Sequence, residues 1–421
     1  MQNLSGAQDF DVIVVGGGPA GLCFAASLQG TPLRIALIER LEEKALAEPA
    51  YDGREIALTL RSVGTLRELG VWQRLPGEHV APLHGARVFN GDSLESLDLQ
   101  APATAAPQIG YLVSNHLLRH AAYQVARANE QVSWFMQARI SDVSCGAEAV
   151  RVGLEQGPVL EAKLLVSADS RLSETRRARG IAARLHDFGR TMLVCRMTHE
   201  IAHQRIAWEW FGHHQTLARL PLNGQRSSVV LTLPHAHITR LLGLTSDAFE
   251  RELERRFAGR LGRMGLDSER FAYPLMGVYA SRFVAERYAA IGDAAVGMHP
   301  VTAHGFNFGL SGQALLARLL REARRAQRNI ADAGLLAHYE RAHRQATLPL
   351  YLATNALVRL YTDETAPARF ARRTLLSLAR HLPPIGSTLS RLLMQGGERA
   401  GGVLPLLPRA HAGEPPVTPD H

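Results

Sequence analysis

The chain has 421 residues, of which 46% are hydrophobic and 20% charged, a balance typical of a folded globular protein rather than a disordered one. Its net charge of +8 comes from 47 basic and 39 acidic residues, but no basic stretch carries interleaved aromatic residues, which disfavours nucleic acid as a partner. The chain has neither a long uninterrupted apolar run nor a signal peptide, so we predict no transmembrane helix. Its three scattered cysteines do not suggest a disulfide framework, which predicts a reducing compartment and hence a cytoplasmic location.

The first forty residues hold the most informative pattern. An apolar run at 11–15 leads into a glycine turn at 16–21 and an apolar helix-like run, and a second strand-like run ends at Glu39. This order is the one that holds a dinucleotide, with the pyrophosphate on the helix N-terminus and the acid on the adenosine ribose. A glycine-rich loop without a ligand is the alternative, but the complete unit favours a dinucleotide. The candidate cofactor-binding residues here are Gly16, Gly18, Pro19, Ala20, Gly21, Glu39 and Arg40.

Each glycine of the turn has a distinct expected role. Gly16 permits the tight turn, Gly18 lets the backbone approach a pyrophosphate, and Gly21 lets the helix pack on the strand.

The middle of the chain changes texture at about residue 184. Before it we predict a loop feeding a helix over 52–70, a helix over 114–129 and three strands ending at 164–166. After it, alternating runs favour one antiparallel sheet with strands at 191–198, 206–211, 215–220 and 227–233, followed by a helix near 246–257. A buried strand returns at 288–293, and helical segments continue to about 395.

A second motif follows that late strand. An acid at a strand end, Asp293, can hydrogen-bond a sugar-like hydroxyl such as the ribityl chain of a flavin, and the loop with Pro300 can lie against the ring. A helix beginning near Gly305 would point its N-terminus at the flavin N1–C2=O edge, where negative charge gathers on reduction. The candidate cofactor-binding residues of this motif are Gly292, Asp293, Pro300, Ala303, His304, Gly305, Phe306 and Asn307.

Two side chains leave alternatives open. His304 is either a catalytic acid–base group over the flavin or, as we favour, a histidine that shapes the loop. Arg54 contacts either the flavin and its phosphates or only a neighbouring acid. The other histidines and the cysteines Cys23, Cys145 and Cys195 lack metal-ligand spacing, so we predict no metal site.

The chain resembles the group A flavoprotein aromatic hydroxylases. Three signatures carry the resemblance: GxGxxG near the start, AD-x-R-x-S-x-x-R at 168–176, and GD-x-A-x-x-x-HP at 292–300. Asp52-x-Arg54 and the segment 110–115 are similar to the ubiquinone-biosynthesis branch of that family, as are stretches between 360 and 394. Within the branch, residues 301–307 look most like enzymes that hydroxylate demethoxyubiquinol-type rings.

The resemblance implies a fold and a reaction. The fold is α/β, with a Rossmann-like FAD-binding domain, an inserted antiparallel-sheet substrate domain and C-terminal helices. The reaction uses FAD, O₂ and NAD(P)H or another reductant, and a flavin C4a-hydroperoxide hydroxylates an aromatic or polyprenyl-quinol substrate. It adds Arg54, Asn115 and Asp169 to the candidate cofactor-binding residues and Pro300, with His304, to the candidate catalytic ones.

Departures from the family pattern leave other functions open. Ser170 stands where the family has glycine after the aspartate, Val296 replaces a histidine, and Ala303-His304-Gly305 replaces GQG. These changes leave the electron donor undetermined. The alternatives are an FAD-dependent reductase, a halogenase, a hydroxylase of another secondary metabolite, or a non-catalytic FAD-containing subunit of a quinone-biosynthesis complex.

The predicted organisation is interleaved. The FAD-binding parts are 1–75, 111–183 and 286–345, the substrate-domain parts 76–110 and 184–285, the C-terminal helices 346–400, and the disordered tail 401–421. A polyprenyl substrate implies peripheral contact with the inner membrane, for which a basic amphipathic stretch around 369–394 is the predicted surface, and contact with other ubiquinone-biosynthesis proteins.

Overall fold

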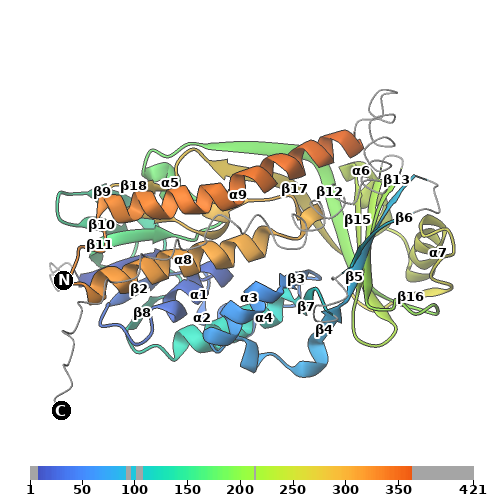
Figure 1. The fold of residues 1–421 in the computed structure, drawn as a ribbon, viewed down its shortest axis with the longest axis horizontal. Helices are drawn as coiled ribbons and strands as arrows, with labels where there is room; N and C mark the ends of the chain where they lie inside the picture. Colours follow the sequence, from blue (N-terminus) through green and yellow to red (C-terminus); the bar gives the residue numbers. More distant parts are fainter. Residues whose placement is uncertain (1–7, 92–95, 101–107, 213–214, 363–421) are drawn as a thin grey trace, which may run out of the picture.

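A computed structural model describes residues 8–91, 96–100, 108–212 and 215–362 of the chain. Within these ranges, two large sheets stand at opposite ends of the molecule and a small sheet lies between them (Figure 1). The predicted amphipathic stretch at 369–394 and the predicted tail at 401–421 lie outside the described residues.

The first large sheet is mostly parallel and carries the glycine turn. Its path is β18-β19-β11-β1-β2-β8, with β10 and β9 added beside β11. Its strands are β1 (Gln8–Val15), β2 (Ile35–Ile38), β8 (Val132–Phe135), β9 (Ile140–Cys145), β10 (Val150–Leu154), β11 (Val159–Ser167), β18 (Val284–Ala285) and β19 (Tyr288–Ala290). Because helices cover both faces of its centre, the end of β1 is apolar and buried at every position from Val12 to Val15.

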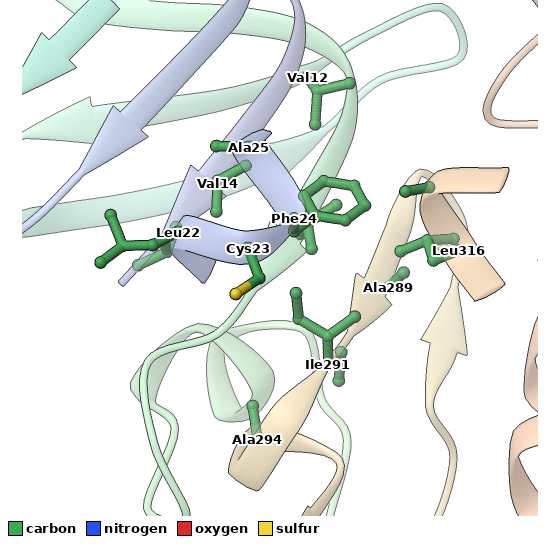
Figure 2. Packing of buried hydrophobic residues seen from close by; sticks show 14 of the residues in the cluster. Val12, Val14, Leu22, Cys23, Phe24, Ala25, Ala289, Ile291, Ala294 and Leu316 are labelled. Atoms are coloured by element: carbon green, nitrogen blue, oxygen red, sulfur yellow. The ribbon is translucent and has the colours of Figure 1, made fainter. Parts of the chain in front are cut away.

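Helices from distant parts of the chain cover this sheet. They are α1 (Pro19–Ser27), α2 (Glu43–Ala47), α3 (Leu60–Glu68), α4 (Asn115–Arg127), α5 (Glu174–Ala178), α8 (Gly305–Arg325) and α9 (Ala333–Thr362). α1 packs against both α4 and α8, and α8 runs beside α9 (Figure 1). Figure 2 shows the shared core, in which Phe24 of α1 lies among Val12 of β1, Ala289 of β19 and Leu316 of α8.

The second large sheet is antiparallel apart from one pairing. Its path is β20-β17-β12-β15-β14-β13-β5-β6, with β16 beside β12, and the β13–β5 pair is parallel. Its strands are β5 (Gly85–Asn90), β6 (Ser96–Gln100), β12 (Ala183–His199), β13 (Ile206–Gly212), β14 (Gln215–Pro221), β15 (Arg226–Leu233), β16 (Met264–Leu266), β17 (Phe271–Ala280) and β20 (Val296–Gly297). The four strands predicted between 191 and 233 are therefore confirmed, although the sheet is not wholly antiparallel.

Two helices cover the outer face of this sheet. α6 (His235–Leu242) and α7 (Ser246–Arg256) bury Leu241 and Phe249 against strand residues such as Trp210 and Leu217. The helix predicted near 246–257 is thus confirmed.

The small sheet joins the two large ones and corrects one prediction. β3 (Glu55–Thr59) and β4 (Val80–Leu83) both pair antiparallel with β7 (Gly110–Ser114). Residues 52–70 were predicted as a loop feeding a helix, whereas a strand precedes the helix. The reason is that β3 forms only by pairing with a segment far along the chain, which local periodicity does not register.

A second prediction was also incomplete, because four strands rather than three lie between 130 and 167. The weakest pattern of the four is that of β9, in which every residue of Ile140–Cys145 is half-buried or exposed. Short 3₁₀ turns complete the fold: η1 (Trp72–Arg74), η2 (Gly77–His79), η3 (Gly292–Ala294) and η4 (Pro300–Thr302). No helix within the described ranges combines the length and the apolar character needed to span a membrane.

Candidate cofactor-binding and active site

The glycine turn between β1 and α1 has the geometry that its sequence predicts. Gly16 has φ +107°, and a Cβ there would lie 2.6 Å from the Ala168 carbonyl oxygen. A Cβ on Gly21 would lie 2.0 Å from the Gly16 carbonyl oxygen, so glycine is required for the helix to pack on the turn. Gly18, the N-cap of α1, differs because a Cβ there would meet nothing within 4 Å. The N-cap of α1 therefore faces open space.

Glu39 closes the turn from the end of β2. It is 8% exposed, and its carboxylate accepts hydrogen bonds from the Gly17 backbone N–H at 2.6 Å and the Leu41 N–H at 2.9 Å. The carboxylate oxygens have further lone pairs that a ribose hydroxyl can use. Arg40, next in the chain, is exposed.

The late Gly-Asp motif lies against the first turn of α1. Gly292 has φ +58°, and a Cβ there would lie 2.8 Å from Cβ of Ala20. Asp293, in η3, is 3.3 Å from the guanidinium of Arg171, and both side chains are more than one-third exposed. The carboxylate of Asp293 is thus held at the junction of three motifs that lie far apart in the sequence.

The loop before α8 brings a second helix N-terminus to this junction. Pro300 begins η4 and is exposed, and Ala303 adopts a left-handed conformation with φ +53° that turns the chain into α8. A Cβ on Gly305, the first residue of α8, would meet nothing within 4 Å. Neither α1 nor α8 has an acidic residue in its first turn, so both helix dipoles present positive ends to open space.

Three predicted residues at the start of α8 lie deeper than Pro300. His304 is the N-cap of α8 and only 3% exposed, and its carbonyl accepts the Phe308 N–H at 2.9 Å. Phe306 is half-buried and packs against the main core. The side chain of Asn307 binds backbone groups: its amide donates to the carbonyls of Ala57 and Ala303, and its oxygen accepts the Thr59 N–H.

His299 has a structural environment. Its ring packs at 4.5 Å from the ring of Phe188, and its Nδ1 accepts the Val301 N–H at 3.1 Å. Burial lowers the pKa of His299 to about 4, so the ring is neutral at physiological pH.

The motif at 168–176 makes hydrogen bonds within the protein, and these contacts support the glycine turn and the late Gly-Asp motif. The Asp169 carboxylate accepts the Ser173 hydroxyl at 2.5 Å and the Thr175 N–H at 3.1 Å, at the start of α5. Ser170 has φ +88°, a conformation that favours glycine. Arg176 is the last residue of the AD-x-R-x-S-x-x-R signature, and the sequence prediction gave it no role. It is 2% exposed and donates to the Ala294 carbonyl at 2.8 Å, which links this motif to the late one.

Arg54 and Asn115 meet at an acid that the sequence prediction left out. Asp52 accepts hydrogen bonds from the guanidinium of Arg54 at 2.6 Å and from the Asn115 side chain at 2.7 Å. These partners lower the pKa of the Asp52 carboxyl against the effect of burial. Tyr273 of β17 donates to the Asp52 carbonyl, so this cluster also reaches the antiparallel sheet. The spacing of Asp52 two residues before Arg54 was the available signal.

The geometry brings together groups that suit an anionic ligand. The described ranges hold no group of three metal-ligating side chains. Two helix N-termini with open glycines, Glu39 at the turn before α1, and Asp293 in η3 beside α8 fit a dinucleotide that carries an anionic pyrophosphate and an electron-rich ring edge.

Comparison with known proteins gives the family. A profile of the FAD-binding domain family matches residues 9–348. The ubiquinone hydroxylase UbiM of Neisseria meningitidis is 42% identical over 387 residues, covering 91% of this chain and 84% of the relative. The chain belongs to the FAD-dependent aromatic hydroxylases, in their ubiquinone-biosynthesis branch. A second relative of this hydroxylase, UbiL of Rhodospirillum rubrum, is 36% identical over 406 residues, covering 96% of this chain and 91% of that protein.

Solved structures show the same fold for this hydroxylase. The p-nitrophenol 4-monooxygenase PnpA of Pseudomonas putida has a TM-score of 0.73 at 16% identity, covering 92% of this chain and 99% of its own. PqsL of P. aeruginosa has a TM-score of 0.71 at 20% identity, covering 85% and 97%. The hydroxylase is a flavoprotein monooxygenase, and enzymes of this class use FAD, O₂ and a reduced nicotinamide.

Proposed function

We propose that FAD binds with its pyrophosphate at the first turn of α1 and its ring at the first turn of α8, and that the enzyme hydroxylates a polyprenyl phenol or quinol intermediate of ubiquinone biosynthesis. The observation that carries the proposal is the pair of helix N-termini. Gly18 and Gly305 face open space. Gly292 lies between the two helices, because it packs against Ala20 of α1 and its Cα would be 3.4 Å from a Cβ on Gly309 of α8.

The chain's own residues would hold and orient the cofactor. Glu39 would accept hydrogen bonds from the adenosine ribose and Asp293 from the ribityl chain, and Arg54 would donate hydrogen bonds to the phosphates or the ring. Pro300 and Ala303 would lie against the ring, with the backbone N–H groups of α8 directed at its polar edge. When bound, FAD supplies the activation of O₂ for transfer to the substrate ring. The cofactor contacts of Asn115, Asp169 and Asn307 are proposed to be indirect, since their side chains already bind the protein.

The substrate class comes from the relatives. UbiM and UbiL are named ubiquinone hydroxylases, and a 24% identical Escherichia coli relative is a 3-demethoxyubiquinol 3-hydroxylase. An electron-rich phenol or quinol ring needs no strong protein base. His304, which is 3% exposed at the N-cap position of α8, is therefore proposed to shape the loop rather than to act as an acid–base group. The enzyme's contribution would be to orient the ring and exclude water.

A halogenase is the alternative that the structure bears on most directly. That chemistry needs a lysine between flavin and substrate, and this chain has only Lys44 and Lys163. Lys163 pairs with Asp11 at 2.9 Å near the start of β1, and Lys44 is exposed on α2. Neither lysine supports a halogenase.

Two conservative glycine substitutions test cofactor placement. Gly18→Ala and Gly305→Ala add a methyl group to open space, so the apoprotein should keep its fold by circular dichroism. We expect each to weaken FAD binding at least about tenfold by keeping the cofactor from the helix ends. Gly64→Ala, in α3, is the matched control and should leave FAD affinity unchanged. Unchanged FAD affinity in both site variants would overturn the placement.

Quinone profiling tests the substrate. A strain lacking this gene should accumulate an under-hydroxylated polyprenyl intermediate by mass spectrometry, and the purified enzyme should hydroxylate that intermediate only with O₂ and a reductant. An unchanged quinone profile would contradict the proposed substrate class. Oxygen-independent turnover would instead favour a reductase, and FAD without turnover would favour a non-catalytic subunit.

The water-insoluble substrate also leads us to propose peripheral contact with a membrane, or delivery by other ubiquinone-biosynthesis proteins. The residues that the sequence offers for this contact, Arg369, Arg372 and Arg373, lie outside the described ranges. We expect flotation with anionic liposomes at low salt, weakened when these three are changed to Gln. Failure to float would favour protein delivery.

A further inference from the structure

One carboxyl group on the antiparallel sheet has no role in the fold. Among the described residues, Glu209 of β13 has neither a hydrogen-bond partner nor an ion-pair partner, although it is only half-buried and lies between two tryptophans in the sequence. A carboxyl that water reaches only in part and that no described protein group binds is held at a cost to stability, so its presence points to a use.

The register of the sheet fixes the face on which Glu209 lies. Its neighbours Trp208 and Trp210 pack with the core under α6 and α7. Because side chains alternate along a strand, Glu209 and Ala207 lie on the opposite face. Ala207 packs against Leu83 and Leu112 of the small sheet, which places this face toward the FAD-binding part of the molecule.

The row of residues through Glu209 is apolar and small. Cross-strand pairing places Ala218 of β14 and Val88 of β5 directly beside it, with Val230 of β15 next in the row. Val230, Glu209 and Val88 are each partly exposed, so solvent or a ligand can reach the strip. The row ends at Phe271, which packs against Gly53 in the loop that carries Arg54.

A second polar group on this face also lacks a partner. Ser228 pairs with Arg196 in the register, so its hydroxyl lies on the same face, and this hydroxyl is buried without a hydrogen-bond partner in the described part of the chain. A face lined by Val and Ala with two unsatisfied polar groups fits a ligand that is mostly apolar and carries oxygen substituents.

We propose that Glu209 is a substrate-binding residue that hydrogen-bonds an oxygen substituent of the aromatic ring. This inference rests on the proposed function. A carboxylic acid can donate its O–H to a ring oxygen and accept a phenolic O–H at its carbonyl, so one side chain can fix the rotation of a phenol or quinol ring.

The surroundings keep Glu209 uncharged at neutral pH. Burial raises the pKa of the Glu209 carboxyl to about 8. The residues flanking it on β14 and β5 are apolar. Charged groups on the same face are already paired: Arg196 with Glu55 of the small sheet, and Arg226 with Asp267. The acid form is therefore the binding form, and ionisation above pH 8 should remove the donor.

Substrate titrations of the FAD-loaded enzyme test the proposal, with a short-chain 2-prenylphenol as probe. We expect Glu209→Leu to weaken phenol binding about tenfold, the loss of one hydrogen bond to a buried group. Glu209→Gln should keep the affinity within about threefold. Wild-type affinity should fall above pH 8, whereas the Gln variant should show no such fall. Glu148→Gln, at an exposed carboxyl in the turn between β9 and β10, is the matched control.

The outcomes separate the two levels of inference. FAD content and thermal stability, measured on each variant, show whether the protein folds. Wild-type affinity and pH dependence in a folded Glu209→Leu variant would overturn the role of Glu209. A wild-type enzyme that holds FAD but neither binds nor hydroxylates any phenol would instead overturn the proposed function.

Discussion

At the scale of single residues, the chain departs from its family at a position with a positive φ, where glycine is favoured. Ser170 replaces the family's glycine yet keeps φ at +88°. The neighbouring side chains impose this conformation, because Asp169 binds Ser173 and Thr175 and so fixes the turn into α5. A non-glycine residue held there stores strain of about 1 kcal/mol or more.

Replacing Ser170 by glycine should therefore stabilise the protein. We expect Ser170→Gly to raise the free energy of unfolding by about 1 kcal/mol in urea titrations of the apoprotein. Ser170→Ala is the matched control, because alanine keeps the strain and should give no gain. Equal stability of the two variants would show that the turn is not strained. If the same residue also limits reductant access, Ser170→Gly should speed flavin reduction by NADPH in stopped-flow experiments.

At the scale of elements, the glycines inside helices differ in whether packing requires them. Gly21 of α1 is needed because a side chain there would strike the Gly16 carbonyl. Gly312 of α8 is needed because a Cβ would lie 2.6 Å from the ring of His343 in α9. Gly64 of α3, by contrast, has open space around its Cβ position and no left-handed φ, so it only weakens its helix.

These contacts predict that a glycine-to-alanine substitution changes stability in opposite directions at Gly64 and at Gly21. Gly64→Ala should stabilise the protein by roughly 0.5–1 kcal/mol through helix propensity. Gly21→Ala should destabilise it or prevent folding, because the clash is with backbone. Thermal unfolding of the two variants measures both effects. A stable Gly21→Ala variant with wild-type FAD affinity would contradict the packing described for the turn.

At the scale of the whole molecule, a buried ion pair joins the small sheet to the antiparallel sheet. Arg196 of β12 binds Glu55 of β3 at 2.7 Å and the Ser114 hydroxyl of β7 at 2.5 Å, and its guanidinium lies 4.6 Å from the ring centre of Tyr51. The Glu55 side chain is 1% exposed, and burial raises the pKa of its carboxyl despite the arginine.

Removing one partner of this pair should cost more than removing both. Arg196→Met leaves Glu55 buried and uncompensated, so we expect a loss of about 3–5 kcal/mol. The double variant Arg196→Met/Glu55→Gln should recover most of that loss. Urea unfolding of the wild type, Arg196→Met, Glu55→Gln and the double variant completes a double-mutant cycle. Additive losses of unfolding free energy would show that the two residues do not interact.

A buried histidine between α8 and α9 predicts acid sensitivity. Burial lowers the pKa of His343 to about 4, whereas the unfolded chain titrates near 6.5. The unfolded state therefore binds more protons between these values, and stability falls as the pH drops from about 6.5 to 4. His343→Leu should remove about 2–3 kcal/mol of the difference in unfolding free energy between pH 7.5 and 4.5. His338→Leu, exposed on the same helix, should leave the difference unchanged.

The sequence by itself determined the parts of this protein whose physics is local. The β1–α1–β2 unit was predictable because its glycines and Glu39 act on one another within forty residues. The strands of the antiparallel sheet were predictable because alternation reports one buried face. The beginning of α8 at Gly305 was predictable because a turn-forming loop precedes it.

Only the tertiary structure decided which side chains meet when they lie far apart in the sequence. β3 exists because β7 pairs with it, and neither strand is specified by its own neighbours. Asn307 binds Ala57 and Thr59 of β3, Asp52 meets Asn115, Arg176 meets Ala294, and Glu209 lies beside Val88; each of these partners is more than fifty residues away in the sequence. The physical reason is that a side chain's partners are set by packing and sheet register, which sum contacts over the whole chain.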